Sequence, residues 1–325
     1  MPIPPSVHRW MTAHDSDPSI RARYLTQVRG LPESNPTVRR ARRRIGREGW
    51  AAQLLSQQFA DGHWASGPQL RERSGGPSLY RPKYTSTIWV AIVLAELGMD
   101  RSDRRVRATA ELLLRTWGGP KGPLGGTESE TCQTGNMVRT LIAFGYLDHP
   151  EVARSIRWLL RAQKPDGGWH CWASRTGTLD GWEALAGLGA IPPAHRSTAV
   201  DEAIERGAEF FLERRLSREG AERYAPWFRI HYPNHYYYDV LVGLRLMVDL
   251  GYARDRRVRP ALDWLESRRL PNGRWPLDVA HPDLEPTIAY QMGQVHYPMV
   301  LEPPGRPSRI ATLEALRVLR AAGRV

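Results

Sequence analysis

Gln163-Lys-Pro-Asp-Gly-Gly-Trp169 decides the fold of this 325-residue chain, because its template, Gln-x3-Gly-x-Trp, occurs more than once. The three tryptophans of the template lie 105 and 106 residues apart. Degenerate copies around Trp117 and Gly220 fall midway, so the sequence repeats with a period of about 50 residues. The other two full copies are Gln58-Phe-Ala-Asp-Gly-His-Trp64 and Arg269-Leu-Pro-Asn-Gly-Arg-Trp275, the latter with arginine in the first position.

A second marker alternates with the first and ends each of four apolar segments. It is a Leu-Gly or Phe-Gly pair such as Leu97-Gly98, and glycine suits the left-handed position that follows a helix. The segments that end in the tryptophan template are more polar. In residues 151–163 the side chains of Val152, Ile156 and Leu159 form one apolar stripe. Each repeat therefore pairs an amphipathic helix with a more apolar helix.

These pairs predict an all-α fold, an α/α toroid of about five helix hairpins with apolar inner and amphipathic outer helices. We expect one domain, residues 1–325, with an N-terminal arm over 1–40 and the repeats over 41–325. The arm should hold one short helix after Pro18. An open solenoid is the alternative, and long insertions before the inner helices favour closure. The expected hairpins are 41–58 with 84–98, 104–116 with 132–145, 150–163 with 178–190, 199–215 with 236–251, and 256–268 with 308–322.

The net charge of +12 does not point to nucleic acid. Only 3 of the 46 basic residues are lysines, a skew that is typical of genomic base composition. The basic run Arg39–Arg44 is interpreted as a solvated helix face, with attraction of a phosphate or diphosphate as the alternative. No nucleic-acid partner is therefore expected.

The sequence also indicates where the protein works. Its first residues lack the apolar stretch of a signal peptide, and the apolar run Ile88–Ala95 is far shorter than the roughly 20 residues of a membrane span. We expect a soluble, cytoplasmic protein that can touch a membrane only peripherally. Two cysteines, Cys132 and Cys171, provide no disulfide framework.

The alternating repeat resembles the squalene cyclase and prenyltransferase repeat of the terpenoid cyclase–protein prenyltransferase superfamily. The resemblance runs from about residue 41 to the C-terminus and is strongest to short, single-ring members. It implies an enzyme that binds an isoprenoid or other lipophilic small molecule in an aromatic-lined central cavity. The repeat is specific for the fold and weak for the activity, so the site must be argued from residues.

Class II cyclases with this repeat carry an Asp-x-Asp-Asp whose middle aspartate protonates an alkene. When residues 236–239 are aligned with it, Asp239 takes the last position and Tyr238 the middle one. A phenol is a poor acid for an alkene, so the chain departs from the pattern at the proton donor. Asp239 itself is then the acid candidate, and a carboxylate favoured by a helix N-terminus is the alternative.

Protein prenyltransferases with this ring hold zinc through Asp, Cys and His at the mouths of inner helices. Here Cys132, Cys171 and His235 all lie in connections from outer to inner helices. Two thiolates and an imidazole with one open position would form a catalytic zinc site that activates a thiol or water. Asp239 would then orient a ligand histidine. Ordinary buried cysteines and a core histidine are the alternative.

Further side chains are expected on the same face. Asp180 and Glu183 begin the inner helix 178–190, where they serve either as acid and base or as first-turn charges after a capping Thr178. His281, Asp283 and His296 lie in a long loop, 276–307, that could cover the mouth. The substrate-lining candidates, which are otherwise packing residues, are Trp172, Trp182, Tyr236, Tyr237, Tyr238, His231 and His170.

Three hypotheses follow. The first is a terpenoid cyclase-like or prenyltransferase-like enzyme with a lipophilic substrate. The second is a zinc-dependent enzyme that uses Cys132, Cys171 and His235. The third is a binding or scaffold ring without catalysis.

Overall fold

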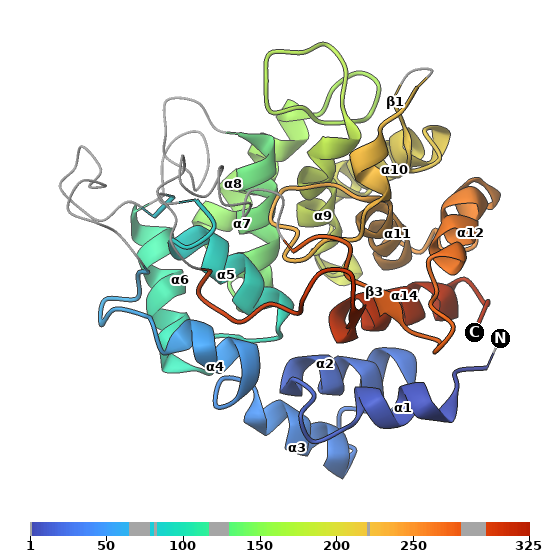
Figure 1. Cartoon of the computed structure of the whole chain (residues 1–325). Helices are drawn as coiled ribbons and strands as arrows, with labels where there is room; N and C mark the ends of the chain where they lie inside the picture. Colours follow the sequence, from blue (N-terminus) through green and yellow to red (C-terminus); the bar gives the residue numbers. More distant parts are fainter. Residues whose placement is uncertain (1, 65–78, 81–82, 117–129, 220–221, 281–296) are drawn as a thin grey trace. The chain divides into compact units, whose positions relative to one another are not determined.

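The computed structural model describes residues 2–64, 79–80, 83–116, 130–219, 222–280 and 297–325. These residues are mostly helical, so the predicted all-α class is confirmed (Figure 1). In the described part of the chain, regular strands form two short antiparallel ribbons. Strand β1 (Arg218–Glu219) pairs with β2 (Glu222–Arg223), and β3 (Trp275–Pro276) pairs with β4 (Pro307–Ser308). No described helix is long and apolar enough to cross a membrane.

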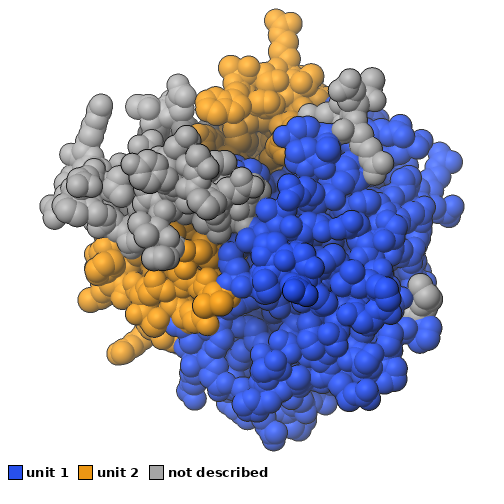
Figure 2. All heavy atoms as spheres, in the orientation of Figure 1, with its two compact units in different colours: residues 1–52, 208–282, 301–325 blue, residues 53–207, 283–300 orange. Residues whose placement is uncertain are grey.

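The chain divides into two compact units, which Figure 2 colours separately. Unit 1 contains residues 1–52, 208–282 and 301–325, and unit 2 contains residues 53–207 and 283–300. Each unit is described by itself below. The toroid and the single domain over residues 1–325 therefore stay predictions.

Unit 2 is built on three apolar helices that pack side by side, with the amphipathic helices against them. The apolar helices are α5 (Thr87–Glu96), α7 (Thr131–Ala143) and α9 (Trp182–Gly189), and α7 contacts both of the others. The amphipathic helices are α6 (Arg104–Thr116), which packs on α5, and α8 (Pro150–Ala162), which packs on α7 and α9. The 3-10 turns η3 (Leu179–Gly181) and η4 (Pro193–His195) flank α9, and α10 (Thr198–Glu213) follows.

Helices α7 and α9 approach until their backbones touch. A Cβ atom added to Gly135 would lie 2.3 Å from the carbonyl oxygen of Glu183, and one added to Gly187 would lie 2.8 Å from the carbonyl oxygen of Gly135. Only glycine fits at such distances, so the sequence of α7 sets the spacing of this helix pair.

Unit 1 joins the N-terminal segment to the last helices of the chain. Helix α14 (Arg309–Ala321) packs on α11 (Val240–Asp249), on α2 (Pro18–Arg23) and on the π-helical turn η1 (Tyr24–Val28). Helix α12 (Arg259–Ser267) packs on α11. The remaining elements of unit 1 are α1 (Pro5–Met11), α3 (Pro36–Arg44), η5 (Ala225–Phe228) and η6 (Arg256–Val258), and α4 (Gly49–Leu55) begins in it.

Two expectations for the N-terminal region were wrong. The expected helix 41–58 is two helices, α3 and α4, because Gly46 and Gly49 adopt left-handed φ angles of 79° and 70° between them. The Asp17 carboxylate fixes this break by accepting a 2.8 Å hydrogen bond from the backbone N–H of Trp50. The arm over residues 1–40 holds α1, α2 and most of α3 rather than one short helix.

The three tryptophans of the sequence template occupy equivalent turns. Each indole N–H donates to the carbonyl of the residue ten positions earlier, at 2.8 Å for Trp64, 2.9 Å for Trp169 and 2.7 Å for Trp275. All three side chains are fully buried. The local repeat in the sequence is therefore a repeat of hydrogen bonding as well.

The glycine of each template turn abuts another helix. Gly62 lies against the backbone of Ala108 in α6, and Gly167 lies against the backbone of Arg206 in α10. Gly273, in the third turn, faces Val7 of α1. Within unit 1 the N-terminal helix thus takes the place that the next amphipathic helix takes in the first two turns.

Candidate functional site

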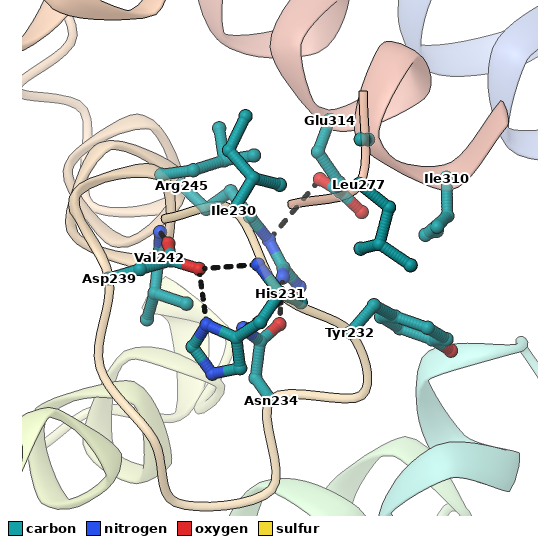
Figure 3. Close-up of a pocket in the computed structure, with 12 residues that line it drawn as sticks. Ile230, His231, Tyr232, Asn234, Asp239, Val242, Arg245, Leu277, Ile310 and Glu314 are labelled. Carbon is teal, nitrogen blue, oxygen red and sulfur yellow. Dashed lines mark hydrogen bonds and ion pairs between the residues drawn. The ribbon is translucent and has the colours of Figure 1, made fainter. Parts of the chain in front are cut away.

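Asp239 begins helix α11 and binds the loop before it. Its Oδ1 caps the helix by accepting from the backbone N–H of Val242 at 2.7 Å. Its Oδ2 accepts from the backbone N–H of His231 at 3.2 Å and from the Nδ1 of the same residue at 2.7 Å. The aspartate predicted as an acid is thus engaged on both oxygens (Figure 3).

The position of the proton on His231 follows from this geometry. A carboxylate only accepts hydrogen bonds, so Nδ1 carries a hydrogen, and in the neutral form of the ring Nε2 is the nitrogen with the lone pair. Both side chains are buried, and Nε2 has no hydrogen-bond partner. A buried imidazole nitrogen without a partner is costly in a purely structural role. The pair is therefore a candidate proton-transfer site.

His231 and Asp239 line a cavity of about 10 Å³ inside unit 1, which is about the space of one water molecule. Its apolar wall is formed by side chains from three segments of the chain, among them Val242, Leu277 and Ile310 (Figure 3). The Tyr232 ring lines another side and stacks on Trp50, with 5.4 Å between ring centroids.

A chain of polar contacts fixes the loop that carries His231. The amide of Asn234 donates to the carbonyl of His231 at 3.2 Å and accepts from Arg245 at 2.9 Å. Arg245 in turn reaches Glu314 of α14 at 3.2 Å. At the other end of the loop, the Asp278 carboxylate accepts from the backbone N–H of Ile230 at 2.8 Å. The imidazole is thus held from both sides.

Glu314 is a buried anion that anchors this arrangement. Burial alone would raise the pKa of its carboxyl, but Arg23, Arg245 and Arg317 hold that pKa well below its ordinary value. The carboxylate pairs with all three guanidinium groups. Unit 1 therefore has a cluster of charged side chains, of which Arg245 and Glu314 form part of the cavity wall.

The three predicted tyrosines do not share one environment. The rings of Tyr236 and Tyr237 stack with 4.6 Å between their centroids. The rings of Tyr237 and His231 form a T-shaped pair with 5.9 Å between centroids. Tyr238 is buried elsewhere, where its hydroxyl donates to the carbonyl of Leu216 at 2.9 Å. Its ring packs on Trp227. In this structure Tyr238 is a packing residue, whereas Tyr237 borders the histidine.

In unit 2, Cys132 and Cys171 meet at the first turn of α7. The sulfur of Cys171 lies 3.4 Å from the backbone N–H of Cys132 and 3.3 Å from the hydroxyl of Thr131. The neighbouring Cys132 side chain lowers the pKa of Cys171 to about 7, against the effect of burial. Proximity to Cys171, together with burial, raises the pKa of Cys132 well above its ordinary value.

Glu183 is the most unusual carboxyl group of unit 2. It is fully buried in the first turn of α9, and neither of its carboxyl oxygens has a hydrogen-bond partner. Burial, followed by the nearby Cys171, raises its pKa well above the ordinary value. The environment of Glu183 therefore favours the protonated form, which a general acid requires.

The other predicted residues of unit 2 are spread between surface and core. The Thr178 hydroxyl accepts from the backbone N–H of Asp180, whose side chain is exposed. Trp182 is buried beneath the guanidinium of Arg139, which lies 5.1 Å from its ring centroid. Trp172 is 72% exposed, and its backbone N–H donates to His170 at 3.0 Å.

The three predicted zinc ligands fall in different units. His235 is fully buried and belongs to unit 1, whereas both cysteines belong to unit 2. Among the described residues there is no group of three or more His, Cys, Asp or Glu side chains that could hold a metal ion. Zinc binding by Cys132, Cys171 and His235 stays a prediction. The candidates His281, Asp283 and His296, like the degenerate copies at Trp117 and Gly220, lie outside the described residues.

No known family and no curated protein matches this chain. Similar solved structures include a protein from Actinoplanes, with 18% identity over 98% of each chain and a TM-score of 0.47. The type II terpene cyclase MstE from Scytonema is 15% identical over 84% of this chain and 96% of its own, with a TM-score of 0.34. A variant of MstE in complex with its substrate, geranylgeranyl dihydroxybenzoate, is 16% identical over 84% and 95%, with a TM-score of 0.32. At such low scores these likenesses decide neither the fold nor the function of this chain.

Sequence reasoning missed the partnership between His231 and Asp239. It placed His231 among substrate-lining residues and considered His235 as the histidine that Asp239 would orient. The signal that was available is the capping position of Asp239, because a capping carboxylate faces the loop before its helix and can bind a side chain there. Arg245 and Glu314 were not singled out at all.

Proposed function

We propose that this chain is an enzyme that moves a proton on an isoprenoid or other lipophilic small molecule, with His231 as the base. The observation that carries the proposal is the buried Nε2 of His231, which lacks a partner while Nδ1 is bound to Asp239. In this arrangement Nε2 takes a proton from the substrate and becomes an imidazolium. Asp239, already 2.7 Å from Nδ1, stabilises that charge without taking the proton itself.

The chemistry of the cavity supports a lipophilic substrate. Apart from the pair of His231 and Asp239 and the polar network that Asn234, Arg245 and Glu314 form, its wall is made of aliphatic and aromatic side chains. A base in such a wall suits removal of a proton from a carbocation, which is converted to an alkene, or from a hydroxyl group that attacks an allylic carbon. A substrate larger than water requires side chains such as Tyr232 to move aside. The resemblance of the repeat to terpenoid cyclases and prenyltransferases adds the isoprenoid class.

The test is conversion of a defined panel of farnesol, geranylgeraniol, their diphosphates and squalene, followed by gas chromatography and mass spectrometry. His231→Gln should lower the rate about 100-fold or more, as loss of a general base does. Asp239→Asn should lower the rate as well. An amide can donate as well as accept, so it no longer holds the His231 ring in the tautomer with hydrogen on Nδ1. His195→Gln, at an exposed histidine of η4, is the matched control. A chain that converts none of the panel, or a His231→Gln variant as active as the control, contradicts the proposal.

A zinc-dependent enzyme is the second candidate, and the meeting of Cys132 and Cys171 favours it. Two sulfurs at one helix terminus form half of a zinc site, and His235 would supply a third ligand. Elemental analysis of the purified chain should then find about one zinc per chain, and Cys132→Ser should lose it. Binding of the panel without conversion would instead support the scaffold hypothesis.

A further inference from the structure

The two cysteines form a thiol pair that the proposed proton transfer does not use. They are 39 positions apart in sequence, and both are partly exposed. The Cys171 sulfur accepts a 3.4 Å hydrogen bond from the backbone N–H of Cys132. Each sulfur is therefore within reach of the other in the same unit.

The surroundings of the two sulfurs differ. Cys171 has two hydrogen-bond contacts, with the Thr131 hydroxyl at 3.3 Å and the backbone N–H of Cys132 at 3.4 Å, at the first turn of a 13-residue helix. Donors of this kind at a helix N-terminus stabilise a thiolate. The Cys132 thiol instead donates to the carboxylate of Glu130 at 3.8 Å, so a negative charge lies beside it. The attacking and resolving roles are thus assigned by geometry.

The loop that carries Cys171 is anchored rather than loose. The Asp166 carboxylate accepts from the backbone N–H groups of Gly168, at 3.2 Å, and Gly177, at 3.0 Å, on either side of the cysteine. The preceding Trp169 is fully buried. This anchoring keeps the Cys171 sulfur beside the start of α7, so that bond formation needs only a small movement.

We propose that Cys132 and Cys171 are a modification site that forms a reversible disulfide in response to hydrogen peroxide. The Cys171 thiolate attacks one peroxide oxygen, the O–O bond breaks, and the hydroxide that leaves is protonated to water. The resulting sulfenic acid is then attacked by the Cys132 sulfur, which loses its proton as a second water departs. The two sulfurs are each oxidised by one electron, one peroxide is reduced to two waters, and a dithiol reverses the bond.

Peptide mapping of the full-length protein tests the proposal. After treatment with hydrogen peroxide and alkylation of the remaining thiols, trypsin should release peptide 122–139 linked to peptide 162–175, and dithiothreitol should separate them. In Cys132→Ser the sulfenic acid has no resolving thiol, so dimedone should label Cys171. In Cys171→Ser dimedone labelling of Cys132 should be at least about tenfold slower, because that sulfur lacks the backbone and hydroxyl donors of Cys171 and lies beside the Glu130 carboxylate. Thr131→Val should slow labelling of Cys171 several-fold.

Three results would overturn the proposal. They are alkylation of both thiols after peroxide treatment, disulfides that join only separate chains, and equal dimedone labelling of the two single-serine variants. Far-ultraviolet circular dichroism checks the fold of each variant, and the wild-type map decides the central point without any variant. The outcome is independent of the proposed activity, because no substrate takes part.

Discussion

Replacement of Trp169 by alanine tests the repeat at the best-defined of its turns. The side chain is fully buried, and its indole N–H donates to the carbonyl of Leu159 at 2.9 Å. The ring also lies against Gly207, where an added Cβ would come within 2.9 Å of it. Loss of a buried tryptophan side chain costs about 3–5 kcal/mol. The buried carbonyl of Leu159, left without its hydrogen-bond donor, adds about 1 kcal/mol or more to the loss of stability.

Urea unfolding followed by circular dichroism at 222 nm measures the effect. We expect Trp169→Ala to lower the free energy of unfolding by about 4–6 kcal/mol, the sum of those two costs. Trp169→Phe, which keeps an aromatic ring but not the donor, should cost less. Trp172→Ala, three residues away and 72% exposed, is the matched control and should stay within about 0.5 kcal/mol of wild type. If Trp169→Ala behaves like Trp172→Ala, the equivalence of the three turns is refuted.

Three further predictions concern the helix pair and the buried acids. Gly135→Ala places a Cβ 2.3 Å from the backbone oxygen of Glu183 and should cost about 1–3 kcal/mol in thermal unfolding by forcing α7 from α9. Burial raises the pKa of the Glu183 carboxyl above its ordinary value of 4.5. The stability that the protonated carboxyl provides is therefore present below pH 4.5 and is lost as pH rises through the raised pKa. Glu183→Gln should melt at a higher temperature than wild type at pH 8, and its melting temperature should depend less on pH. Three arginines lower the pKa of the Glu314 carboxyl, although burial alone would raise it. The stability that the carboxylate provides is therefore present above pH 4.5 and is lost as pH falls through the lowered pKa. Glu314→Gln should lower the free energy of unfolding by about 3 kcal/mol at pH 7 and by less in acid.

Each of these has an opposite outcome. A Gly135→Ala variant as stable as wild type would mean that α7 and α9 are not in backbone contact. A Glu183→Gln variant that melts lower than wild type at pH 8 would show that the carboxylate is ionised and paired in the fold. Equal stability of wild type and Glu314→Gln at pH 7 would show that the arginine cluster does not depend on its anion.

The all-α fold was predictable because its signals are local and repeated. Apolar segments that end in a Leu-Gly or Phe-Gly pair mark α5, α7, α9 and α11 along the sequence, and the template turns recur with the same hydrogen bonds. The division of the expected helix 41–58 was not predictable in the same way. It depends on glycines with left-handed φ angles and on the carboxylate of Asp17, a residue far away in sequence.

Of the candidate site, the sequence singled out Asp239 and His231 but not their pairing, and it singled out neither Arg245 nor Glu314. Asp239 was singled out by its place at the start of an apolar helix, and the structure shows it as the cap of α11. His231 reaches Asp239 only because the irregular loop between them is held at Ile230 by Asp278 and at Asn234 by Arg245. Such tertiary contacts leave no periodic trace in the sequence.

The measurement that tests the central claim most directly is the protonation of His231 in the folded chain. Nitrogen-15 NMR of the histidine rings, assigned by the signals that His231→Gln removes, distinguishes a nitrogen that carries hydrogen from one with a lone pair. We predict that in the neutral form of the His231 ring Nδ1 carries the hydrogen and Nε2 is bare, and that Asp239→Asn abolishes this fixed tautomer. A hydrogen on Nε2 with a bare Nδ1, or no change in Asp239→Asn, would contradict the account of His231 as a base held by Asp239.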